Sequence, residues 1–262
     1  MSVSEFPRVA VNMAMTLDGK VMRPDGGWHG LTSDADRARM DRYRQAADVI
    51  FVGKNSIAAD DPVVLPARLR KSSGTLKGGE QWPVPCMIAR SSLPPADRKL
   101  FLDSNRRGVR PLLFIGRDQD AVVQADFISP PVSGQALRVA GLPQGDASDT
   151  ENLAALIERA DVLPFARELL EPAMVLDWLY RERGVRRVLL EGGPKVNHAF
   201  FAADLVDVLY LTLVPFLIGR NDLPGIVDGD EAFTRFDQPG RWRLDRSEAV
   251  GREVFLKYSR IR

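Results

Sequence analysis

The chain has 262 residues, of which 45% are hydrophobic, so it is long enough for one large domain or two small ones with a substantial core. Its 36 lysines and arginines nearly balance its 35 aspartates and glutamates, which excludes a strong overall attraction to nucleic acid or to an anionic membrane. One cysteine and two histidines exclude an internal disulfide and leave no zinc-ligand spacing, so we expect no metal site.

No apolar run approaches the ~18 residues that a membrane-spanning helix needs. The first residues also lack the order of a secretion signal, in which positive charge precedes an apolar segment. We therefore expect a soluble, cytoplasmic protein that acts on a small molecule.

The first quarter of the chain predicts a strand, a helix and a second strand. Residues 8–15 are largely apolar and precede the turn-prone pair Asp18-Gly19. Ser33 stands where an N-cap would begin a helix over 35–47, and an apolar strand over 49–52 follows and ends at Gly53. This is the scale of a crossover unit in a parallel sheet.

The rest of the chain continues this alternation. Strands are expected over 84–89, 111–116, 185–190, 206–214 and 253–258, and helices over 152–161, 173–183 and 194–203. Gly184 is placed to end the second of these helices. The pattern predicts a single α/β domain spanning 1–262, with a mostly parallel mixed sheet flanked by helices and with loop insertions at about 65–83 and 130–171.

The run from Leu189 to Asn197 reads as a strand ending on Glu191, a turn at Gly192 and Gly193, and a helix that starts at Pro194. Glycine lets a ligand approach the main chain, and the free N–H groups of a helix start favour phosphate. The alternative is a tight strand-to-helix turn in which Glu191 is merely solvated.

The segment from Val52 to Pro62 shows the same order of elements after another strand, with a glycine followed by a polar loop. Ser56 could hydrogen-bond a phosphate or ribose, Lys54 could meet an adenosine 2′-phosphate, and Asp60 and Asp61 would face a cationic or hydroxylated group. The alternative is that Ser56 caps a short helix and that the aspartates form a turn.

A third candidate is the turn from Met15 to Lys20, which could direct Asp18 and Lys20 into a cleft and position a substrate. The alternative is an ordinary turn of the hairpin type. The first predicted helix carries Arg37, Arg39, Arg42 and Arg44; most of these arginines are expected on a solvated face, and only one or two could reach a ligand.

Together, the segments 15–20, 52–62 and 191–194 resemble the pyrimidine reductase family of riboflavin biosynthesis, which is the C-terminal reductase domain of a bifunctional deaminase-reductase. The resemblance implies a dihydrofolate-reductase-like fold, a homodimer, and reduction of the ribosyl group of a phosphoribosylamino-pyrimidine to ribityl with NADPH. The sequence has none of the deaminase motifs, His-x-Glu with Pro-Cys-x-x-Cys, so no deaminase domain is expected.

The resemblance also implies roles for individual residues. For the cofactor these are Met15 at the nicotinamide, Gly53, Ser56, Asp60 and Ser91 along the dinucleotide, and Gly192, Gly193, Pro194, Lys195, Val196 and Asn197 at the pyrophosphate. For the substrate they are Asp18, Arg44, Val64, Arg68 and Glu191. Asp60 or Glu191 would supply the proton that accompanies hydride transfer.

Two positions depart from the family pattern. Gly30 stands where the family commonly has tryptophan, with Trp28 just upstream, and Ala67 stands where the family has an arginine that holds the substrate phosphate. A shift of one residue would bring Arg68 to that place. Because these departures concern the substrate side, two alternatives stay open: a reductase of the same fold acting on another substrate, such as a dihydrofolate-like pterin, and a non-catalytic dinucleotide-binding module.

Overall fold

The computed structural model describes residues 6–27, 30–67, 81–117, 147–230, 232–233 and 241–261. In these ranges nine strands form one sheet in the order β5-β4-β3-β2-β6-β1-β7-β9-β8. The strands are β1 (Arg8–Thr16), β2 (Val49–Phe51), β3 (Val84–Ala89), β4 (Leu112–Arg117), β5 (Asp161–Ala166), β6 (Arg187–Leu190), β7 (Val208–Val214), β8 (Trp242–Val250) and β9 (Glu253–Arg260). Only the two pairings that involve β9 are antiparallel, which confirms the predicted mostly parallel mixed sheet.

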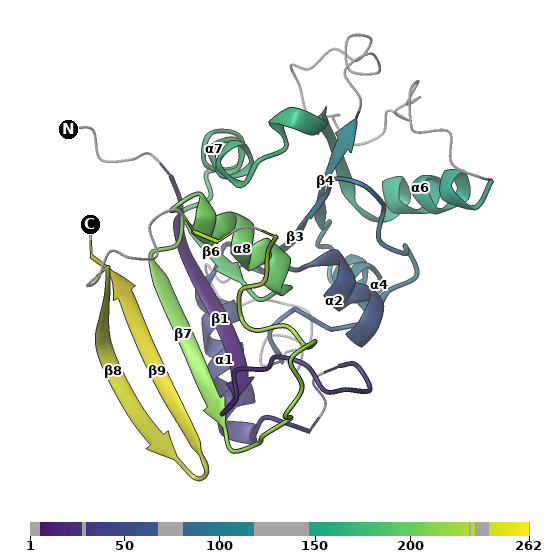
Figure 1. Cartoon of the computed structure of the whole chain (residues 1–262). Helices are drawn as coiled ribbons and strands as arrows, with labels where there is room; N and C mark the ends of the chain where they lie inside the picture. The colour runs from purple at the N-terminus through teal and green to yellow at the C-terminus, as the bar shows by residue number, and fades with distance from the viewer. Residues whose placement is uncertain are drawn as a thin grey trace.

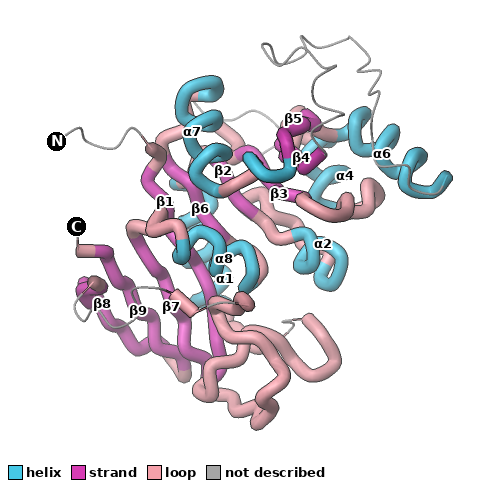
Figure 2. The backbone as a smooth tube through the Cα atoms, turned by 45° about the horizontal axis from the view of Figure 1, so that its top comes forward, coloured by secondary structure: helices cyan, strands magenta, loops and turns pink. Residues whose placement is uncertain are grey.

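Helices cover both faces of the sheet (Figure 2). They are α1 (Asp34–Ala46), α2 (Lys54–Asp60), α4 (Lys99–Arg106), α6 (Ala147–Arg159), α7 (Pro172–Arg183) and α8 (Pro194–Ala202), with a short 3-10 turn η1 (Arg167–Leu169). Successive residues of β2 enter different cores: Val49 and Phe51 pack with α7 and α8, whereas Ile50 packs with α2, α4 and α6. The central strands are therefore buried on both faces, as is usual for parallel sheets.

Two predicted helix signals are confirmed. Ser33 is the N-cap of α1, where its hydroxyl accepts hydrogen bonds from the N–H groups of Ala35 (3.2 Å) and Asp36 (3.3 Å). Gly184 ends α7 with a φ of 63°, a left-handed conformation that glycine adopts without steric cost.

The structure differs from the predicted elements in three places. The expected loop insertion over 130–171 contains α6, β5 and η1 from residue 147 onward, so this part of the chain belongs to the sheet and its cover. Neither β8 nor α4 was expected from the sequence. Most of the predicted insertion at 65–83 lies outside the described residues.

Two long loops meet where β1 and β7 end. The segment 17–27 follows β1, the segment 215–230 follows β7, and they lie side by side (Figure 1). Leu17 donates its N–H to the carbonyl of Phe216 (2.9 Å), and Val21 donates to Pro224 (3.1 Å). Because the main strands are parallel, these loops share one edge of the sheet with the turns that follow β2 and β6. No helix in the described ranges is long and apolar enough to cross a membrane.

Candidate active site

The turns that follow β2 and β6 pack directly against each other. Glu191 donates its N–H to the carbonyl of Phe51 (3.0 Å), and a Cβ added to Gly192 would lie 2.3 Å from the nitrogen of Gly53. Gly192 thus lacks a side chain because the neighbouring turn occupies that space. This packing accounts for the glycine, and the predicted role of Gly192 at the pyrophosphate stays a prediction.

Gly193 has a different environment. It precedes α8 with a φ of 58°, and an added Cβ would meet only the Cα of Gly53 (3.7 Å) and the Oγ of Ser56 (3.8 Å). The first N–H groups of α8 have no acceptor within the helix, and Pro194 in the first turn has no N–H at all. A helix start that opens beside a serine hydroxyl is the arrangement expected of a phosphate cradle.

Asp60 is the last residue of α2, and its Oδ1 is buried without a hydrogen-bond partner among the described residues. Burying a carboxylate oxygen without a donor is costly, so native proteins rarely leave one in that state. A bound ribose hydroxyl would supply the missing donor. The orphaned oxygen therefore fits a dinucleotide in this cleft.

Arg44 and Glu191 form a buried ion pair. Arg44 donates from Nε to Oε1 (2.7 Å) and from Nη2 to Oε2 (2.6 Å), and its Nη1 donates to the carbonyl of Val63 (3.0 Å). Burial alone would lower the pKa of Arg44, but the charge and hydrogen bonds of Glu191 outweigh it and hold this pKa above its ordinary value. The two residues that the sequence assigned separately to a substrate bind each other.

Asp18 fastens the loop after β1 to the loop after β7. It accepts hydrogen bonds from the hydroxyl of Thr16 (2.5 Å) and from the N–H groups of Ile218 (3.0 Å) and Gly219 (2.7 Å). The Thr16 hydroxyl and then the Gly219 N–H lower the pKa of Asp18 to about 2. Lys20 joins the same two loops through the carbonyl of Leu223 (3.1 Å). These contacts give Asp18 and Lys20 structural partners in place of the expected substrate.

Polar side chains after β2 and β3 also meet. Lys54 donates a hydrogen bond to Ser92, and the expected cofactor residue Ser91 is exposed next to it. The sequence analysis did not identify Ser92, because its contact joins neighbouring strands that are far apart in the chain.

The remaining predicted site residues differ in how deeply they are buried. Met15 is half-buried near the end of β1, and Lys195 is exposed on α8. Val64 and Val196 pack in two separate hydrophobic cores, and Asn197 is fully enclosed, where its amide donates to the carbonyl of Ile226 (2.8 Å). Trp28 and Arg68, on which the substrate side depends, lie outside the described residues.

The chain is similar to known proteins over most of its length. The RibD C-terminal domain family matches residues 7–110 and 135–256. The 2,5-diamino-6-ribosylamino-4(3H)-pyrimidinone 5′-phosphate reductase of Methanothermobacter thermautotrophicus is 26% identical over 255 residues, covering 97% of this chain and 98% of the relative. The riboflavin biosynthesis protein RibD of Mycobacterium tuberculosis is 25% identical and covers 96% of this chain, which spans 54% of that relative.

Solved structures show the same fold. A pyrimidine reductase-like protein from Corynebacterium diphtheriae superposes with a TM-score of 0.71 at 20% identity, covering 98% of this chain and 92% of that one. The predicted dihydrofolate-reductase-like fold is thereby confirmed. With its family matched over most of its length, the chain belongs to the RibD C-terminal domain family, the pyrimidine reductases of riboflavin biosynthesis.

Proposed function

We propose that this protein is an NADPH-dependent reductase that converts the ribosyl group of a phosphoribosylamino-pyrimidine to ribityl. The observation that carries the proposal is the junction of the turns after β2 and β6, where the open helix start at Gly193 faces Ser56 of α2, and Asp60 at the end of α2 has an unpartnered buried oxygen. Membership of a family of riboflavin-pathway reductases supports the same reaction class.

The 2,5-diamino-pyrimidinone 5′-phosphate is the first candidate substrate. Two relatives that match over 98% and 94% of their own length are named for its reduction. The RibD relatives match over about half of theirs. The deaminated uracil form is the second candidate, and the two differ only in the pyrimidine ring.

In this proposal the pyrophosphate of the cofactor lies at the N-terminus of α8, and Ser56 and Asp60 contact its ribose and phosphate groups. Lys54, held by Ser92, offers a positive charge for a 2′-phosphate and so favours NADPH over NADH. When bound, NADPH supplies the hydride that reduces C1′ of the ribosyl group.

Asp60 is the better candidate for the proton donor. Both oxygens of Glu191 accept hydrogen bonds from Arg44 and are thereby occupied, whereas Oδ1 of Asp60 has no partner among the described residues. We assign Glu191 a positioning role, because its backbone N–H binds Phe51 and its side chain ties α1 to the turn that carries Gly193. Arg68 remains the candidate for the substrate phosphate, and we expect a homodimer in the cytoplasm.

The test is NADPH oxidation by the purified chain with three substrates: the 2,5-diamino-pyrimidinone phosphate, its uracil counterpart and dihydrofolate. We expect turnover with the first two and none with dihydrofolate. Tight NADPH binding without NADPH oxidation in the presence of any of the three substrates would favour a dinucleotide-binding module instead.

Two variants locate the sites. Gly193→Val should weaken NADPH binding because the side chain would fill the space beside Ser56, and unchanged affinity in a folded variant would refute the cradle. Arg68→Ala should raise KM for the phosphorylated substrate and leave NADPH affinity unchanged. If KM does not move, another residue holds the substrate phosphate.

A further inference from the structure

A cavity lies at the opposite edge of the sheet from the turns that are proposed to hold the cofactor. It has a volume of about 1320 Å³, and its floor includes Val49, Val84 and Leu112, the first residues of β2, β3 and β4. The last turn of α1 and the segment that links α7 to β6 complete its walls. Because β2, β3, β4 and β6 are parallel, this edge holds their amino ends, whereas the cofactor cleft lies at their carboxyl ends.

Positive charge is concentrated around this cavity. Its lining includes two aspartates and six arginines: Arg42, Arg107, Arg110, Arg183, Arg186 and Arg187. The lining thus carries an excess of four positive charges, although the whole chain carries a net charge of only +1. Such a local field attracts anions even when the overall charge is near zero.

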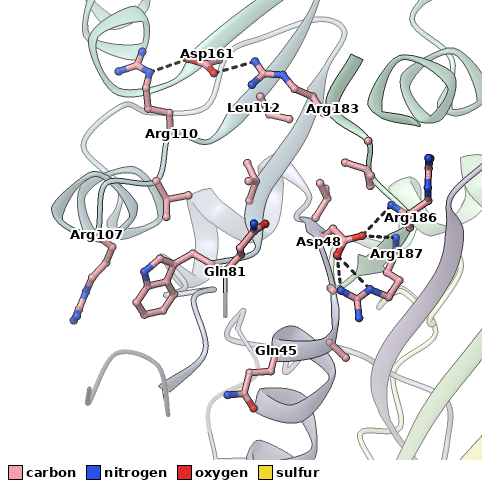
Figure 3. A pocket seen from close by; sticks show the side chains of 18 of the residues that line it. Gln45, Asp48, Gln81, Arg107, Arg110, Leu112, Asp161, Arg183, Arg186 and Arg187 are labelled. Carbon is pink, nitrogen blue, oxygen red and sulfur yellow. Dashed lines mark hydrogen bonds and ion pairs between the residues drawn. The ribbon is translucent and has the colours of Figure 1, made fainter. Parts of the chain in front are cut away.

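The two aspartates hold part of this arginine rim in place. Asp48 lies 2.6 Å from Arg187 and accepts the N–H groups of residues 186 and 187, both at 2.9 Å (Figure 3). Asp161 pairs with Arg110 at 2.8 Å and with Arg183 at 3.3 Å. Arg110 also donates to three carbonyls at the end of α6, so its role is to fasten that helix.

Of the other three arginines, Arg107 lies against Trp82, and two have no carboxylate partner within the described residues. Arg42 on α1 and Arg186 before β6 are exposed and have no ion-pair partner within the described part of the chain. Arg186 lies over the ring of Tyr180, 3.9 Å from its centre, which fixes the position of its charge without neutralising it. Arginine binds phosphate in a bidentate manner, so these two residues are the ones free to hold a phosphate group.

The rest of the lining suits a flat ring. The floor is apolar, and Trp82 is half-buried at the wall with the guanidinium of Arg107 lying 5.8 Å from its ring centre. Gln45 and Gln81 add neutral donors and acceptors. A hollow that combines an apolar floor with polar groups at its rim can hold a small molecule, and an indole is a stacking surface for a nucleobase. We propose that this cavity binds a nucleotide, with its phosphates at Arg42 and Arg186 and its base against Trp82.

The test is calorimetric titration of the full chain with ADP, alone and with saturating NADPH, which is expected in the other cleft. ADP alone can also occupy the proposed cofactor site, so the decisive titration is the one with saturating NADPH, in which one ADP should still bind per chain. Complete displacement of ADP by NADPH would overturn the proposal, as would the absence of ADP binding. If NADPH itself fails to bind, the proposed function fails, while the titration with ADP alone still tests this cavity.

Variants assign the binding to this cavity. The double change Arg42→Ala/Arg186→Ala should weaken ADP binding at least about tenfold, since it removes two charge-assisted contacts. Arg252→Ala, an exposed arginine between β8 and β9, is the matched control and should leave ADP affinity unchanged. Trp82→Leu should weaken ADP binding and spare inorganic pyrophosphate. Equal ADP affinity in the double variant and the control, or pyrophosphate binding as tight as that of ADP, would contradict the assignment.

Discussion

Single charged residues hold the walls of the candidate active site together. Arg44 joins α1 to the end of β6 through Glu191, and Asp18 joins the loops that follow β1 and β7. Both contacts connect residues at least 147 positions apart in the chain. The sequence identified these residues as functional but assigned them to a ligand, because a partner so distant in the chain leaves no local signal.

We predict that Arg44→Ala destabilises the protein by about 3–5 kcal/mol, because it leaves the Glu191 carboxylate buried without its partner. The double change Arg44→Met/Glu191→Leu removes both charges and should restore most of that loss. Urea unfolding measures both effects. The control is Arg37→Ala, which breaks the exposed pair with Asp34 and should cost no more than about 0.5 kcal/mol. A single-variant cost below that of the control would contradict the prediction.

Asp18 should make stability depend on pH in acid. Its pKa is lowered from 3.8 to about 2 in the folded protein, so its contribution is present above pH 3.8 and is lost as the pH falls toward 2. Asp18→Asn should therefore lower the thermal midpoint above that window and flatten its decline within it. The neighbouring exposed carboxylate Asp25 gives a control, Asp25→Asn. If the thermal midpoints of wild type and Asp18→Asn follow parallel curves against pH, the hydrogen bonds of Asp18 contribute nothing to the pH dependence of stability.

At the scale of elements, the central strands and their turns were predictable and the periphery was not. The segments that became β2 and β6 carry apolar runs followed within two residues by glycine, and α8 begins at Pro194 after two glycines, so their sequences predict them well. The edge strand β8 is mostly exposed, which removes the apolar pattern by which a strand is recognised. Within residues 147–166 only a helix over 152–161 was expected, and the start of α6 and the strand β5 were missed because the surrounding stretch is rich in proline and glycine.

The contact between the turns after β2 and β6 should tolerate no side chain at Gly192. An added Cβ would lie 2.3 Å from the nitrogen of Gly53 and 2.8 Å from the Cα of Val52, and backbone atoms do not move aside easily. We predict that Gly192→Ala costs about 3 kcal/mol or more in urea unfolding. Gly108→Ala has open space and only the strain of a φ of 72°, so it should cost about 1 kcal/mol. Equal costs would mean that the two turns do not pack as described.

At the scale of the whole molecule, the single sheet carries one proposed binding site at each of two edges. The carboxyl ends of its parallel strands carry the proposed cofactor cleft, and the amino ends of β2, β3, β4 and β6 carry the arginine-lined cavity. The sequence predicted the first edge through three glycine- and aspartate-containing turns. It gave no comparable signal for the second, whose arginines come from α1, α7 and the segments between strands.

The resemblance to a dimeric family also predicts the state of the molecule in solution. Light scattering should give a mass twice the 29.1 kDa of one chain. A mass of 29.1 kDa at micromolar concentration would contradict the expected homodimer, while leaving the proposed chemistry within one chain untouched.

Hydride transfer itself is the most direct test of the account. The chain is incubated with NADPH deuterated at the nicotinamide C4 and with the 2,5-diamino-pyrimidinone phosphate, and the product is analysed by mass spectrometry. We predict a ribityl product that carries one deuterium at C1′ when the transferred position is labelled. Unreduced substrate, or a reduced product without deuterium from either labelled face, would contradict the assignment as an NADPH-dependent reductase.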